Sequence, residues 1–96
     1  MTLEELRQTK KGQILQLAAS YGARNVRVFG SLARGDNSPS SDIDFLVDLD
    51  PDRSLMDLGG LLMELQEMLQ ARVDVATERM LRQKVRERAL LDAVPL

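Results

Sequence analysis

The sequence contains no cysteine, no histidine and no tryptophan, and its aromatic residues are limited to two phenylalanines and one tyrosine. Without cysteine there can be no disulfide and no thiolate metal site, and a zinc site made of carboxylates alone is unfavourable. Without histidine, nucleophilic catalysis of the Ser-His or Cys-His kind is excluded. The chemistry left to this chain is that of oxygen ligands, which suit Mg²⁺ or Mn²⁺.

A strong net charge and long hydrophobic runs are also missing. The net charge is −2 over 96 residues, so no overall basic field attracts nucleic acid, and three aromatic rings offer little stacking for single strands. No apolar run approaches the length of a membrane span, and the polar segment Met1–Leu6 does not resemble a secretory signal. We therefore expect a cytoplasmic protein with no membrane or direct nucleic-acid contact, and a single domain spanning residues 1–96.

Hydrophobic periodicity predicts an α+β fold, in which helices pack on a small mixed sheet. A period of 3.6 residues predicts helices over 3–20, 55–69 and from Thr77 to about Ala93, the last ended by Pro95. Strict alternation predicts strands over 26–29, 43–49 and 73–76, and a short helix is expected from Gly30 through Arg34. Capping-box patterns open the first two long helices, and Gly22 is a natural stop after the first.

Three aspartates are predicted to share one face of this sheet. Asp42 and Asp44 project from the same side of their strand, and Asp74 joins them if its strand is the neighbour. Two carboxylates 4 Å apart repel by about 4 kcal/mol at an effective dielectric constant near 20. Such a group has to take up protons or cations, and two divalent ions there could clamp the attacking and leaving oxygens of a nucleotidyl transfer.

A turn suited to phosphate precedes these aspartates. Gly30 lets the backbone approach a ligand closely, Ser31 supplies a hydroxyl at the start of the short helix, and Arg34 carries a fork that matches phosphate oxygens. A Gly-Ser pair alone is usually only a turn, and an Asp-x-Asp pair alone is usually a solvated strand end. The combination of both with a third aspartate favours a nucleotide site over a chance arrangement.

These residues resemble a known family. Gly30-Ser31, ten intervening residues and Asp42-Ile43-Asp44 resemble the signature of the DNA polymerase β nucleotidyltransferase superfamily, and Val73-Asp74-Val75 resembles its third-carboxylate strand. The whole chain is similar to minimal nucleotidyltransferase domains. The segments 29–35 and 89–96 resemble the antitoxin branch of that group, whose members are partnered with HEPN-domain RNase toxins.

The resemblance implies a polymerase β-like fold and a role for each residue. Asp42 and Asp44 would bind two Mg²⁺ ions (or Mn²⁺), Asp74 would complete the catalytic metal site, and Gly30 and Ser31 would hold the triphosphate with help from Arg34. The implied reaction is the transfer of AMP from ATP to a hydroxyl, a tyrosine in the antitoxin branch, of a HEPN toxin bound in a hetero-oligomer. Such an adenylyltransferase would act as an antitoxin by AMPylation of its partner.

Two other functions stay open from the sequence. The chain could neutralise a toxin by binding alone, although pure binding needs no clustered carboxylates. It could also modify a small molecule of the aminoglycoside type, although no acceptor-binding region is evident.

Two further patterns in the sequence have more than one interpretation. The basic residues of the last helix fit a solvated face, or else contact with nucleotide phosphates or an acidic partner. They are Arg79, Arg82, Lys84, Arg86 and Arg88. The Leu/Met stripe over 55–69 favours core packing over a partner-binding face, and Tyr21 is interpreted as a packing residue.

Overall fold

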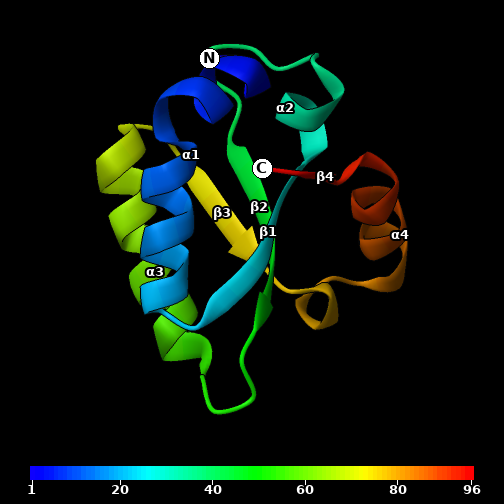
Figure 1. The fold of residues 1–96 in the computed structure, drawn as a ribbon. Coiled ribbons are helices and arrows are strands. Elements are labelled where there is room, and N and C mark those ends of the chain that lie inside the picture. Colours follow the sequence, from blue (N-terminus) through cyan, green and yellow to red (C-terminus); the bar gives the residue numbers. More distant parts are fainter.

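A four-stranded mixed sheet with strand order β3-β2-β1-β4 organises the computed structural model, which describes residues 1–96 (Figure 1). The elements follow the chain as α1 (Leu3–Ser20), β1 (Ala23–Phe29), α2 (Gly30–Arg34), β2 (Ile43–Leu49), α3 (Leu55–Leu69), β3 (Val73–Ala76), a 3₁₀ turn (Glu78–Met80), α4 (Gln83–Asp92) and β4 (Val94–Pro95). The predicted α+β architecture with a mixed sheet is confirmed. No helix in the structure is both long and apolar enough to cross a lipid bilayer.

Strand pairing decides which side chains meet at the site. β1 pairs antiparallel with both β2 and β4, whereas β2 and β3 run parallel. In the parallel pair, Ile43 lies opposite Val73 and Asp44 opposite Asp74. Because neighbours in register point to the same side of a sheet, Asp44 and Asp74 project from the same face.

The opposite face of the sheet carries the core. α1 and α3 lie together on that side, and α2 and α4 lie on the other (Figure 1). The core is one cluster of 17 buried residues, among them Phe45, Leu61 and Leu65. The predicted stripe on α3 is confirmed as core at Leu58, Leu61, Leu65 and Leu69, although Leu55 is 69% exposed at the start of the helix.

The predicted helix ends are confirmed in atomic detail. The Thr2 hydroxyl accepts a hydrogen bond from the backbone N–H of Glu5 at 3.1 Å. Ser54 and Asp57 form the full capping box at α3. Tyr21 is half-buried against the core, as interpreted from the sequence, and its hydroxyl donates a hydrogen bond to Glu64.

β1 is longer than the predicted strand 26–29, since it begins at Ala23. The reason lies at Asn25, whose φ of +51° interrupts regular pairing, and the register with β2 shifts between Arg24 and Arg27. Asparagine tolerates this left-handed conformation better than most residues do. The irregularity breaks the alternation of side chains, and only the regular half of the strand was recognisable.

The helical region predicted from Thr77 to about Ala93 is present but is divided into two segments. The 3₁₀ turn ends at Met80, Leu81 and Arg82 are extended, and α4 begins at Gln83. The chain has to pass from β3 at one edge of the sheet to β4 at the other. The break directs α4 onto α2 and β1, where Ala89 becomes buried.

The end of the chain adds a strand that periodicity did not predict. β4 contains only Val94 and Pro95, which is too short for a pattern. Its pairing with β1 continues in the hydrogen bond from the Leu96 N–H to the Val26 carbonyl at 3.1 Å. Arg7 of α1 donates to the carbonyls of Pro95 at 2.6 Å and Leu96 at 3.2 Å, so the C-terminal segment is tied to the sheet and to α1.

Candidate active site

Gly30 stands where β1 ends and α2 begins, directly against Asp44. Its φ of +73° lies in the left-handed region that favours glycine. A Cβ at this position would come within 2.5 Å of Asp44 Oδ2. Glycine is therefore required here both for the turn and for the space that the Asp44 carboxylate occupies.

Asp44 and Asp74 form a pair of acidic residues in register across β2 and β3. Asp44 is half-buried and Asp74 is exposed. Side chains in register on neighbouring strands approach closely, so like charges there repel. The repulsion indicates a site that is electrostatically unfavourable until a proton or a cation compensates it.

The pKa of the Asp44 carboxyl is raised from 3.8 to about 6. Burial is the largest cause, the charges of Asp74 and Asp42 add to the rise, and the Arg34 guanidinium opposes it. Both other aspartates predicted from the sequence thus act on Asp44. A strongly shifted carboxyl beside a second carboxylate is a feature of functional sites.

Asp42 forms an ion pair with Arg72 in this structure. Its Oδ1 accepts from Nε of Arg72 at 3.0 Å, and the side chains of Arg72 and Asp42 are 73% and 50% exposed, respectively. In this conformation no three acidic side chains gather closely enough to hold a metal ion. The sequence reasoning missed Arg72, which lies beside Asp42 because the Ile43 N–H donates to the Arg72 carbonyl at 2.9 Å. Only the parallel pairing of β2 with β3 reveals this contact.

Ser31 and Arg34 occupy different surroundings on α2. Ser31 is half-buried, and its hydroxyl makes no hydrogen bond within the protein. Arg34 instead binds Asp92 of α4 at 2.6 Å and Asp36 at 3.1 Å. Hydrogen bonds to Asp36 and Asp92 hold the pKa of Arg34 above its ordinary value. The Arg34 charge is therefore largely compensated, and the residue fastens α2 to α4.

A small cavity opens between α2 and α4. It has a volume of about 290 Å³. Its lining includes Gly30, Arg34 and Asp92, together with Lys84 and Arg88 of α4. The basic residues of the last helix are thus divided, since only Lys84 and Arg88 among them line this cavity.

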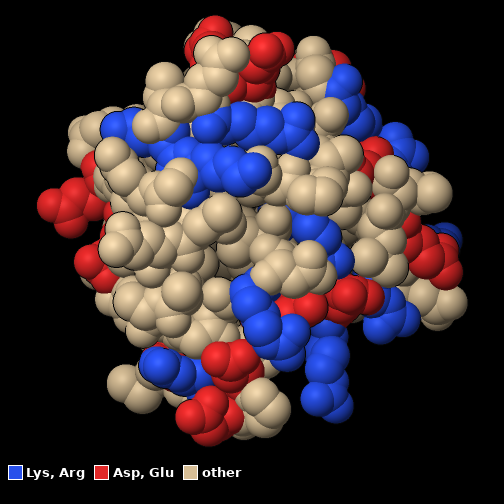
Figure 2. Space-filling model, in the orientation of Figure 1, with Lys and Arg blue, Asp and Glu red and all other residues tan.

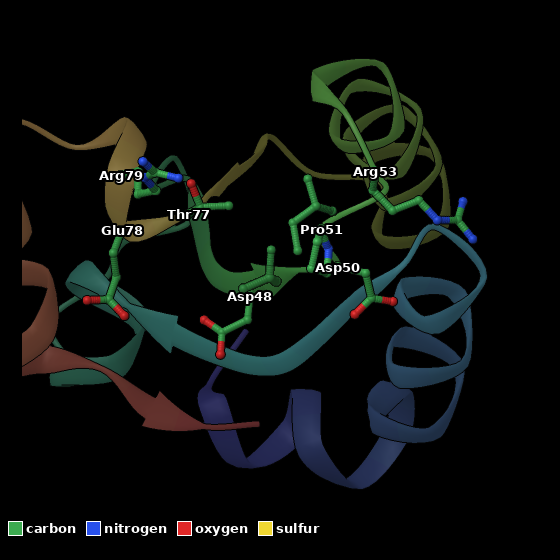
Figure 3. A pocket seen from close by; sticks show the side chains of 9 residues that line it. Asp48, Asp50, Pro51, Arg53, Thr77, Glu78 and Arg79 are labelled. Atoms are coloured by element: carbon green, nitrogen blue, oxygen red, sulfur yellow. The ribbon is translucent and has the colours of Figure 1, made fainter.

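A larger cavity of about 530 Å³ lies at the end of β2 that contains Asp48, and Gly30 is not among the residues that line it (Figure 3). Asp48, Asp50 and Glu78 border it, but arginines already neutralise them. Its lining contains none of the metal-binding or phosphate-binding residues predicted from the sequence. We therefore place the candidate site at Asp44 and not in the larger cavity.

The surface charge is divided into small groups. The face in Figure 2 carries separate groups of basic and acidic side chains with uncharged surface between them. On this face neither sign of charge forms one extensive field.

Sequence comparison identifies the relatives of this chain. The nucleotidyltransferase domain family matches residues 11–96. The protein adenylyltransferase MntA of Thermococcus cleftensis is 32% identical over 98% of this chain and 95% of its own length. A Methanocaldococcus jannaschii protein named as a candidate protein adenylyltransferase, MJ0435, is 37% identical over 88% of this chain and 90% of its own length.

Solved structures agree with the sequence comparison. A structure described as a candidate minimal nucleotidyltransferase is 44% identical, with a TM-score of 0.85, and the match covers 100% of this chain and 97% of that one. A toxin–antitoxin crystal structure with AMP-PNP shares the fold, with a TM-score of 0.74 at 20% identity over 88% of this chain and 69% of that one. The chain therefore belongs to the nucleotidyltransferase domain family and is a nucleotidyltransferase.

Proposed function

We propose that this protein is a metal-dependent adenylyltransferase that transfers AMP from ATP to a tyrosine hydroxyl of a HEPN-type RNase toxin and thereby acts as its antitoxin. The observation that carries the proposal is the contact of Gly30 with Asp44, whose carboxyl lies in register with Asp74. This contact brings a Gly-Ser turn, which we propose binds phosphate, next to the carboxylates of Asp44 and Asp74. The names of the relatives, protein adenylyltransferases, support the same reaction.

The residues present fit a site for Mg²⁺ or Mn²⁺ by the chemistry of their donors. Asp42, Asp44 and Asp74 offer carboxylate oxygens only, which these hard cations prefer. The raised pKa of Asp44 shows a local demand for positive charge. Asp44 and Asp74 would hold the two ions together with Asp42 once its carboxylate leaves Arg72. Ions bound there would neutralise charge on the phosphate and on the carboxylates.

The proposed transfer forms one bond to phosphorus and breaks one. The acceptor hydroxyl oxygen forms a bond to the α-phosphorus of ATP, and the bond from that phosphorus to the bridging oxygen breaks. Pyrophosphate leaves with the electron pair, and the hydroxyl proton passes to Asp74. In this proposal Gly30 and the free Ser31 hydroxyl hold the triphosphate, which leaves its α-phosphorus facing Asp44.

The acceptor would come from another molecule. Asp74 and Asp42 lie at the exposed surface of the sheet, so the protein alone does not surround an acceptor there. A partner bound in a hetero-oligomer would close the site and exclude water from it. The solved toxin–antitoxin structures that share the fold support this arrangement.

Transfer of label from ATP tests the proposal. The protein is incubated with [α-³²P]ATP, Mg²⁺ and the purified partner toxin, and the partner is expected to become labelled. Asp42→Asn and Asp44→Asn should each reduce labelling by about 100-fold or more, because each removes a charge that acts on the reacting phosphate. Asp52→Asn, an exposed aspartate outside the site, is the matched control and should label like the parent protein.

Three results would contradict the proposal in different ways. Labelling that survives both aspartate substitutions would remove these residues from the reaction. If the Asp42→Asn variant transferred no label but still neutralised the toxin fully, the result would favour an antitoxin that works by binding alone. Transfer to small alcohols or aminoglycosides with no protein partner would favour a small-molecule nucleotidyltransferase.

A further inference from the structure

α4 presents two cations to the cavity beside Gly30. Lys84 and Arg88 are four residues apart, which puts them on the same helical face on successive turns. Both line the cavity of about 290 Å³ between α2 and α4. Neither forms an ion pair in the structure, in contrast to Arg34, which binds Asp36 and Asp92. Three cations and one carboxylate thus line the cavity, and the carboxylate is already paired.

The cavity and the acidic pair meet at Gly30. One side of this glycine lines the cavity, and a Cβ built on it would come within 2.5 Å of Asp44 Oδ2. An elongated anion could therefore cross the bare glycine with one end among the α4 cations and the other at Asp44. The volume lies near the lower end of the usual range for ligand pockets, about 300–1,000 Å³.

The position of α4 depends on the fold and not on a local motif. The break at Leu81 and Arg82 directs the helix back across the sheet, and the contact of Arg34 with Asp92 holds it against α2. Ala89, next to Arg88, is 2% exposed, so the backbone of α4 is packed against the protein. The helix that carries the exposed side chains of Lys84 and Arg88 is therefore in place before any ligand binds, which lowers the entropic cost of binding.

We propose that Lys84 and Arg88 bind the β- and γ-phosphates of the nucleoside triphosphate and so select triphosphates over monophosphates. This inference rests on the proposed function, because it extends the same site. The guanidinium of Arg88 can donate two hydrogen bonds to phosphate oxygens, and the Lys84 ammonium adds a point charge. Arg34 keeps α4 in position, and its charge-paired guanidinium is not the main phosphate ligand in this arrangement.

Calorimetric titration with Mg²⁺-ATP, in the absence of any acceptor, tests the inference. Lys84→Ala and Arg88→Ala are each expected to weaken ATP binding about tenfold, the value of one charged hydrogen bond. Lys84→Arg and Arg88→Lys should retain most of the affinity. Arg82→Ala removes the same charge from a residue outside the cavity and should bind ATP within about twofold of the parent.

The transfer reaction gives a second readout. With the partner present, Lys84→Ala and Arg88→Ala should raise KM for ATP more than they lower kcat, and thermal denaturation should show each variant folded. Inorganic tripolyphosphate should compete with ATP for the parent protein. Its inhibition constant should rise about tenfold in either alanine variant. If Arg82→Ala weakened ATP binding equally, the effect would come from the overall charge of the protein and not from the cavity. That result would overturn the inference.

The two proposals fail separately. If the parent protein binds ATP and labels its partner while both alanine variants bind ATP like Arg82→Ala, the α4 assignment is wrong and the proposed function stands. If the parent protein neither binds ATP nor labels any partner, the proposed function fails, and the α4 inference fails with it.

Discussion

The two faces of the sheet differ in what their side chains do, although the same strands supply both. On β2, Phe45 is fully buried under α1 and α3, while its neighbour Asp44 points to the other face with a pKa raised to about 6. The first face concentrates apolar contacts, and the second concentrates charges that repel one another. The comparison shows that one face stabilises the fold by apolar burial, whereas the other carries like charges that lower stability.

The largest effect is expected from the apolar face. Leu61→Ala should lower the free energy of unfolding by about 2–5 kcal/mol, because Leu61 is only 1% exposed and its removal leaves a cavity in the core. Leu55→Ala on the same helix is the control, since Leu55 is 69% exposed, and it should change stability by less than about 0.5 kcal/mol. Urea denaturation measures both. Similar losses in the two variants would contradict the division between the faces.

The next effect separates backbone strain from the site. Gly30→Ala and Gly35→Ala both place alanine at a positive φ, +73° and +84°, and each should lose about 1–2 kcal/mol of stability. Only the methyl group at position 30 meets Asp44, whereas nothing lies within 4 Å of one at position 35. Gly30→Ala alone should therefore also reduce labelling of the partner, by about 100-fold, because the carboxylate is displaced.

Stability and labelling are measured on the same preparations of the two glycine variants. Gly35→Ala is expected to label the partner at the parent rate once the folded fraction is taken into account. If both variants labelled equally, the contact between Gly30 and Asp44 would have no part in the reaction.

A smaller effect is expected at the helix cap of the apolar face. Ser54→Ala should cost about 1 kcal/mol of stability, because the Ser54 hydroxyl accepts from the Met56 N–H at the start of α3. Ser54→Thr should restore most of it, since threonine caps helices too. Thermal denaturation provides the measurement. If the Ser54→Ala variant were fully folded but failed to label the partner, the cap of α3 would affect the site on the other face of the sheet, which this structure does not predict.

The smallest effect is a gain of stability on the charged face. The folded-state pKa of Asp44, about 6, lies above its ordinary value of 3.8, so the folded protein binds more protons than the unfolded chain between these two values. Stability should therefore fall as pH rises from about 4 to about 6. Asp44→Asn removes this term and should raise stability at pH 7 by about 1 kcal/mol or less, because the group is partly solvated.

The Asp44 comparison requires a chelator, which keeps divalent ions from the site. The quantity to follow is the difference in unfolding free energy between the parent protein and Asp44→Asn over pH 4 to 7, which removes the contribution of the other carboxylates. A difference that stays constant over this range, or that grows as pH falls, would show that the Asp44 pKa is not raised in the folded state.

The predictable parts of the molecule were those with local causes. The predicted helices, from about 3 to 20 and along the stripe 55–69, and the predicted strand 43–49 match the structure, because caps and periodicity lie within the segments themselves. The parts that differed have causes elsewhere in the chain. The irregular half of β1 depends on Asn25 and its pairing with β2, and the break before α4 depends on where the sheet ends.

The candidate site divides in the same way. The residue types and spacing at Gly30, Ser31, Asp42, Asp44 and Asp74 were readable from the sequence, and their roles at a metal and a nucleotide stay predictions. The pairing of Asp42 with Arg72 and of Arg34 with Asp92 was not readable. Each joins residues on different elements, and no local pattern records which elements become neighbours.

The amino-acid sequence was thus sufficient to predict the class of chemistry, the family and most helices and strands. Oxygen ligands, helix caps and hydrophobic periods can be recognised within a few residues. The folded chain alone decided how those elements combine. Parallel pairing of β2 with β3 brought Asp74 opposite Asp44, and the return of α4 across the sheet carried Lys84 and Arg88 to the cavity beside Gly30. These contacts span 30 residues or more because they arise from the burial of one shared core.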